Sequence, residues 1–171
     1  EKGLLRRIRT TPTTSSEFMA SQAVSNMIIA MIQVATVFLV ATLVGYQPLG
    51  DVTSFILAFI ILSIFSLCCV GFGLIAATLA KSSGAATGIA FIFIMPLMFL
   101  GTFVSVGLSA IAKDAGKFVP SYYVTDALTS LFLRGASVTS PAILLDISIV
   151  TIYSAVVLIL GIILYGKYGK T

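Results

Sequence analysis

Three amide side chains, Gln22, Asn26 and Gln33, follow one another at helical spacing in an otherwise apolar stretch. Such amides can line a polar translocation path through a bundle of membrane helices. They can also join neighbouring helices through hydrogen bonds of about 0.6 kcal/mol each. We favour the second interpretation, because helix bundles commonly use polar residues in this way.

The sequence lacks the residue patterns that enzymatic chemistry needs. It has no histidine, which excludes the Ser-His-Asp and Cys-His arrangements, and it has no phosphate-binding loop. Its two cysteines, Cys68 and Cys69, are adjacent, a spacing that suits neither a disulfide framework nor a zinc site. We therefore predict no catalytic residue, no metal and no cofactor in this chain, and expect another protein to supply the energy for its function.

The composition is that of a membrane protein. Hydrophobic residues make up 58% of the chain and charged residues only 9%, where a soluble domain has about a quarter charged. A helix needs roughly 20 apolar residues to cross a bilayer core about 30 Å thick. Four windows without any charge are long enough: 18–50, 52–80, 82–112 and 147–166.

We predict an all-α fold, a polytopic transmembrane helix bundle in which residues 1–171 form a single transmembrane domain. The expected spans are 21–44, 52–79, 85–106 and 142–165, with a kink at Pro96 in the third. A cytoplasmic amphipathic helix is expected at 1–13, and an extracytoplasmic segment at 107–140. Because the chain begins at Glu1, we expect a fragment or a processed product of a longer protein.

Helix boundaries can be predicted at three points. Thr14 and Glu17 have the spacing of a capping box, which predicts a helix start near Ser15. In the outer segment, Ser121 is expected to cap a short re-entrant or amphipathic helix that ends at Gly135. Its apolar face should carry Val124, Leu128, Leu131 and Phe132.

Small residues gather on both sides of the turn between the second and third spans. Gly84 and Gly88 form a G-x-x-x-G pattern, and Gly71 and Gly73 lie near the end of the second span. Small residues let membrane helices approach closely. We therefore predict that these glycines pack the second span against the third.

Basic residues predict the orientation of the bundle, because cytoplasmic loops carry an excess of lysine and arginine. With four spans, one side holds seven basic residues and the other three. This places both termini and Lys81 in the cytoplasm, and Asp146 outside. The spans are then expected to bury no ionisable residue, which argues against a proton-driven or cation-driven pump.

The first residues combine basic and apolar side chains at helical spacing, with Leu4, Leu5 and Ile8 on one face and arginines beside them. Such a helix lies on anionic lipid or docks on a cytoplasmic partner. The composition alone favours anionic lipid.

Three stretches of this sequence resemble the ATP-binding cassette (ABC) type-2 permeases. Glu1–Pro12 resembles their cytoplasmic segment, which reaches a Thr-Pro pair before a span. Gly73–Ala77 with Lys81–Ser83 is similar to a turn between two spans of that family. Pro96–Gly101, Val119-Pro120 and Asp126–Leu128 with Gly135 resemble the outer region before the last span. The family has six spans, so the resemblance implies that this chain is the C-terminal four.

The resemblance implies specific roles. The basic helix becomes a coupling helix docked on an ABC nucleotide-binding subunit, through Glu1, Leu4, Leu5, Arg6, Arg7 and Arg9. The outer gate would include Pro120, Tyr122, Asp126 and Arg134. ATP and magnesium would bind the partner, and a second permease copy would complete a homo- or heterodimer in the cytoplasmic membrane. No nucleic-acid partner is expected.

The implied function is that of a multidrug-type efflux permease for a hydrophobic or amphipathic, drug-like or lipid-like small molecule. We favour such cargo because the spans lack charge. Two alternatives remain at this point: a membrane scaffold or channel-like component without an ATPase partner, and a membrane enzyme whose active residues lie elsewhere in a longer chain.

Overall fold

The computed structural model describes residues 15–80, 82–103 and 114–168, and it confirms the predicted all-α membrane fold. The described residues form six helices: α2 (Ser15–Leu43), α3 (Val52–Leu79), α4 (Ser83–Met98), the π-helix η1 (Phe99–Phe103), α6 (Pro120–Phe132) and α7 (Pro141–Tyr168). Four helical stretches are long and apolar enough to cross a membrane: Val24–Leu43, Val52–Leu79, Gly84–Gly101 and Pro141–Tyr168.

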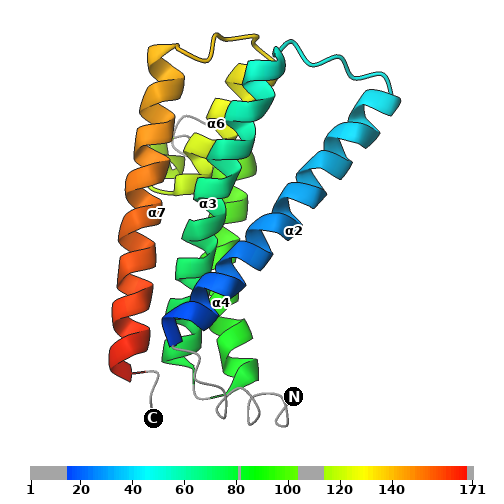
Figure 1. Ribbon diagram of the computed structural model, residues 1–171. Helices are drawn as coiled ribbons and strands as arrows, with labels where there is room; N and C mark the ends of the chain where they lie inside the picture. The colour runs from blue at the N-terminus through cyan, green and yellow to red at the C-terminus, as the bar shows by residue number, and fades with distance from the viewer. Residues whose placement is uncertain (1–14, 81, 104–113, 169–171) are drawn as a thin grey trace.

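Helix α3 is the centre of the bundle. Its most extensive interface is with α7, which runs beside it along its length, while α4 and α2 contact other sides of α3 (Figure 1). The start of α2, the turn between α3 and α4 and the end of α7 lie at one end of the bundle (Figure 1). We call this the inner end and the opposite one the outer end.

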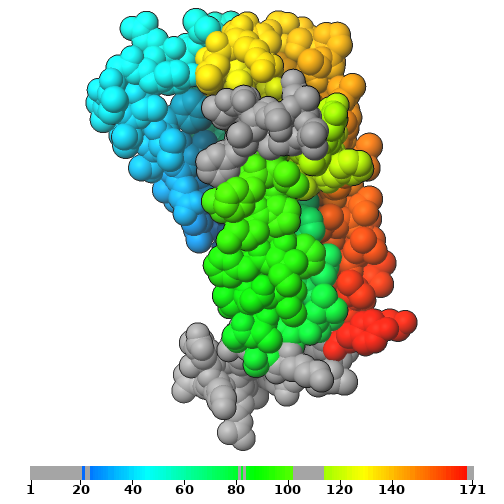
Figure 2. All heavy atoms as spheres, turned by 180° about the vertical axis from the view of Figure 1, so that it is seen from behind, coloured from blue at the N-terminus to red at the C-terminus, as the bar shows by residue number. Residues whose placement is uncertain are grey.

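Helix α2 is tilted and only loosely attached to the rest. None of the residues of its membrane-length stretch is buried. Seen from the other side, it stands apart from α4, and side chains of both helices are uncovered (Figure 2). An apolar helix with bare faces is compatible with a bilayer, where lipid covers these side chains.

Aromatic side chains attach α2 to the bundle at its outer half. The ring of Phe38 lies 5.1 Å from that of Phe55 on α3 and 4.7 Å from that of Phe132 on α6. Centroid distances of this size are typical of favourable ring contacts. The three rings therefore join three helices at one point, beside a core of buried apolar residues.

The α6 helix lies in the outer half of the bundle, between α3 and α7 (Figure 1). Val124, Leu131 and Phe132 are buried and Leu128 packs beside them, so the predicted apolar face is confirmed. Gly135, at φ 62°, reverses the chain after the helix, as predicted. At the last turn, the carbonyl oxygen of Phe132 accepts hydrogen bonds from the Leu49 N–H at 3.1 Å and the Tyr46 hydroxyl at 3.2 Å.

The predicted cap of α6 is wrong. The helix begins at Pro120 after Val119, without a side-chain cap. The Ser121 hydroxyl instead donates to the carbonyl oxygen of Leu97 at 2.7 Å. Leu97 follows Pro96, where the helix passes into the π-helix η1, and polar side chains often satisfy backbone groups near such irregularities in membranes. The helix that contains Pro96 therefore ends in a π-helical turn, and Ser121 joins α6 to α4 just before that turn.

Candidate functional site

The side chains predicted to dock a partner lie outside the described residues. They are Glu1, Leu4, Leu5, Arg6, Arg7 and Arg9. The helix that follows them begins at Ser15, as the capping-box spacing predicted, and its first turn lies at the inner end. The turn before Ser83 and the end of α7 lie at the same end (Figure 1).

The three amides of the first span differ in their surroundings. The side chain of Gln22 lies outside the described part, and Asn26 and Gln33 are exposed. Neither the Asn26 nor the Gln33 side chain forms a hydrogen bond with another described residue, so the predicted bonding between helices is not found among the described residues. Asn26 instead contributes to a pocket.

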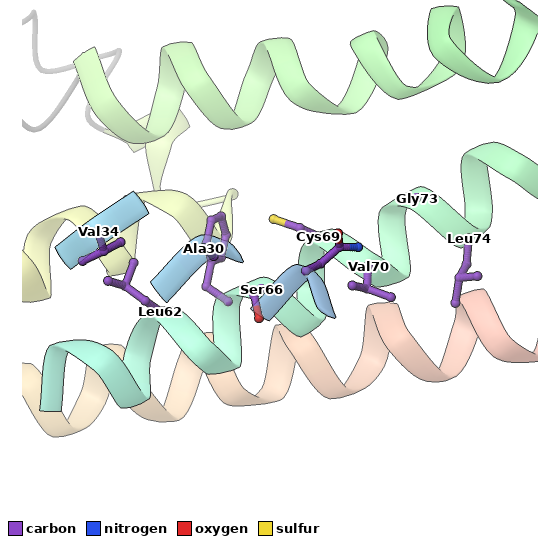
Figure 3. Close-up of a pocket in the computed structure, with 10 residues that line it drawn as sticks. Ala30, Val34, Leu62, Ser66, Cys69, Val70, Gly73 and Leu74 are labelled. Carbon is purple, nitrogen blue, oxygen red and sulfur yellow. The ribbon is translucent and has the colours of Figure 1, made fainter. Parts of the chain in front are cut away.

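This pocket lies between α2 and α3, and we call it the α2–α3 pocket. It has a volume of about 450 Å³ and is lined by Asn26, Ala30, Val34, Leu62, Phe65, Ser66, Cys69, Val70, Gly73 and Leu74. Figure 3 shows the lining residues of α2 and α3, with α7 running alongside α3. Cys69 is exposed, whereas its neighbour Cys68 is buried.

The glycines do not bring α3 and α4 together as predicted. Gly71 packs on α7: a Cβ atom there would lie 2.9 Å from the backbone of Val157 and Leu158. At Gly73, Gly84 and Gly88 an added Cβ would meet no described atom within 4 Å. Helices α3 and α4 instead meet through larger side chains, such as the rings of Phe72 and Phe93 at 5.1 Å.

The predicted outer-gate residues all belong to α6 or follow it directly. Pro120 and Tyr122 are buried, and Arg134 lies 3.4 Å from the carboxylate of Asp126 and 3.2 Å from the Ser130 hydroxyl. These bonds tie the chain after α6 back to the helix. The structure therefore places three of these residues in α6 and Arg134 just after it, and their role as an outer gate stays a prediction.

No group of three or more His, Cys, Asp or Glu residues that suits a metal ion occurs within the described ranges. The four apolar helices point to a role in the membrane itself.

A family model described as ABC-2 type transporter matches residues 1–133 of the chain. The chain belongs to the ABC-2 type transporter family. No curated protein and no solved structure matches it. The matched region covers the predicted coupling segment and every described helix up to α6, so this ABC-2 chain is a multi-pass membrane component of a transporter. Such a component agrees with the prediction that the chain is not itself an enzyme.

The ABC-2 chain also contains a site that the sequence prediction missed. Asp146, expected outside the membrane, lies in the second turn of α7, is only 6% exposed, and its Oδ2 atom has no described hydrogen-bond partner. The prediction that the spans bury no ionisable residue is therefore wrong. Asp146 belongs to the buried stripe of α7 that continues with Val150 and Ser154, at four-residue spacing. This four-residue spacing is the sequence pattern from which the buried position of Asp146 could have been predicted.

Asp146 faces α6 of the ABC-2 chain. Burial raises the pKa of the Tyr122 phenol, and the nearby carboxylates of Asp126 and Asp146 raise it further. Burial also raises the pKa of Tyr123, to which the charges of Tyr153 and Asp146 add. The outer half of the permease therefore holds a buried carboxylate beside the tyrosines of α6.

Proposed function

We propose that this ABC-2 chain is part of the permease of an ATP-driven exporter that moves a hydrophobic or amphipathic small molecule across the cytoplasmic membrane. The single observation that carries the proposal is the family match over residues 1–133, which covers the segment proposed for coupling and the first three of the four spans. ATP and magnesium bind a separate or fused nucleotide-binding subunit. A second permease copy completes the transporter.

The charge distribution supports a cytoplasmic inner end. The structure places the start of α2, the α3–α4 turn and the end of α7 at one end. The basic residues that adjoin these three segments in the sequence are Lys2, Arg6, Arg7, Arg9, Lys81, Lys167 and Lys170. The opposite side has only Lys113, Lys117 and Arg134. By the positive-inside rule, the inner end faces the cytoplasm, where ATP is available.

In this proposal the basic segment before α2 is the coupling helix. Its leucines enter a cleft of the nucleotide-binding subunit, and Glu1, Arg6, Arg7 and Arg9 form ion pairs at the rim. Because α2 follows this segment directly and is loosely packed, a push from the closing ATPase subunits moves α2 relative to α3. The α6 segment closes the outer side.

The choice of cargo rests on the polarity of the spans. Between Phe18 and Gly50, and between Val52 and Ala80, the chain has no charged residue, and a strongly charged cargo would need charged partners there. Asp146 is the one acidic side chain buried in the described spans, and it lies near the outer end. An uncharged or amphipathic cargo fits these surroundings best.

The test is ATP hydrolysis by the full-length permease reconstituted with its nucleotide-binding subunit in proteoliposomes. We expect lipophilic amphiphiles to raise the hydrolysis rate above the rate with lipid alone, and water-soluble glycans to leave it unchanged. Strong stimulation by a glycan, with none by any lipophilic compound, would refute the cargo class. An ATPase that neither binds the permease nor responds to it would refute the exporter.

A further inference from the structure

The α2–α3 pocket has the depth of a site that is loaded from within the bilayer. Its α3 lining runs from Leu62 to Leu74, so it begins about 15 Å from the outer end of α3 at Val52 and ends about 8 Å from Leu79. Since the hydrocarbon core is about 30 Å thick, the pocket occupies the middle and the inner half of the membrane. Molecules dissolved in lipid reach this depth directly.

We propose that the α2–α3 pocket binds the apolar body of a single-chain amphiphile that enters sideways from the inner leaflet, as the first cargo site of the permease. This inference rests on the proposed function and adds a site and a substrate class to it. The volume of about 450 Å³ lies in the range of small-molecule sites, and the lining is largely apolar with a few polar atoms.

The polar atoms of the pocket indicate which polar group the ligand carries. The Ser66 hydroxyl already donates to the carbonyl oxygen of Ser63 at 2.7 Å, so it offers only an acceptor. The Asn26 amide lines the same pocket, has no partner among the described residues, and offers both donors and an acceptor. An ester, amide or hydroxyl group next to an apolar chain would satisfy Asn26 without bringing a charge into the membrane.

Small side chains create the space in the pocket. Ala30 on α2 and Gly73 on α3 both belong to the lining, and a Cβ atom at Gly73 would meet no described atom within 4 Å. A larger residue at position 73 therefore fills the pocket without displacing a helix. Gly88 on α4 has the same open surroundings but does not line the pocket, so it supplies a matched control.

The experiment uses the full-length permease in lipid nanodiscs and a lysophospholipid with a photoactivatable diazirine in its acyl chain. We expect labelling of the α3 peptide that contains Cys69, and we expect unlabelled lysophospholipid to compete with it. Gly73→Leu should lower this labelling by roughly tenfold, since its side chain occupies part of the apolar volume that favours binding. Gly88→Leu should leave it unchanged.

Labelling that does not saturate, or that Gly73→Leu leaves unchanged, would show ordinary lipid at the protein surface and overturn the proposal. The absence of any label on this peptide would show that another part of the protein fills the pocket, which also overturns it. If the Gly73→Leu variant does not fold, the rate of Cys69 alkylation is measured instead, in a Cys68→Ala background. The amphiphile should slow this alkylation. Equal rates with and without the amphiphile would refute the site.

The same preparations separate this inference from the proposed function. ATP hydrolysis is measured in parallel with the nucleotide-binding subunit present. Specific labelling without any response of an ATPase would leave the pocket as a lipid site and remove the exporter. Amphiphile-stimulated hydrolysis without specific labelling would keep the exporter and remove this pocket as its cargo site.

Discussion

The tight crossing of α3 and α7 should fail when Gly71 acquires a side chain. A Cβ atom at position 71 would lie 2.9 Å from the amide nitrogen of Leu158 and from the carbonyl group of Val157. Ordinary contacts between such atoms need about 3.5–4.0 Å, so α7 must retreat by roughly 0.6–1.1 Å. These contacts are with backbone atoms, which cannot rotate away. Gly161 faces the same crossing, where a Cβ would lie 2.8 Å from the Gly71 carbonyl oxygen.

Gly71→Ala should therefore lower the free energy of unfolding by about 1–3 kcal/mol relative to Gly73→Ala, the usual cost of overpacking. Gly73→Ala is the matched control, because both changes bring the same gain in helix propensity and position 73 is open. At about 2–4 °C per kcal/mol, the midpoint of thermal unfolding should fall by about 2–12 °C. The assay is the fraction of monodisperse permease after heating in mild detergent. Equal midpoints for the two variants would refute the close approach of α3 and α7.

Three further predictions concern the outer half and the orientation. Phe132→Ala should cost about 3–5 kcal/mol in thermal stability because it opens the aromatic cluster, whereas Leu133→Ala, at an exposed neighbour, should cost little. Asp146→Asn should keep or raise the melting temperature, since it removes a buried charge whose Oδ2 lacks a partner in the described structure; a marked loss would show that the carboxylate is required. In a background without native cysteines, Ser137→Cys should react with an impermeant maleimide added outside intact cells. Ser83→Cys should react with the same reagent only after the cells are permeabilised. The reverse pattern of reactivity would contradict the proposed topology.

The membrane helices themselves were predictable because uncharged apolar runs bounded by polar turns determine them. The second span was predicted at 52–79, and α3 spans Val52–Leu79, between the turn at Gly50 and that at Lys81. The last span was predicted at 142–165 and α7 is slightly longer, at Pro141–Tyr168. Length and hydropathy decide such boundaries, and neither depends on which helix lies beside which.

Contacts between helices were less predictable, since periodicity identifies a face and not its partner. The small residue Gly71 was assigned to the α3–α4 contact, because these helices are neighbours in sequence, but it packs on α7, which is distant in sequence. Asp146 was placed on the outer side by the orientation that the basic residues predict, although its spacing to Val150 places it on the buried stripe of α7. Ser121 bonds Leu97 across 24 residues, a contact that no local capping pattern contains.

The association of the permease with the proposed nucleotide-binding subunit tests the central claim most directly. We predict that the wild-type permease retains this subunit during purification and that Arg6→Glu with Arg7→Glu releases it, because reversing two charges of the coupling segment opposes docking. Lys167→Glu with Lys170→Glu, the same charge reversal at the inner end of α7, should retain it. Undiminished co-purification of the nucleotide-binding subunit with the Arg6→Glu, Arg7→Glu permease would contradict the account.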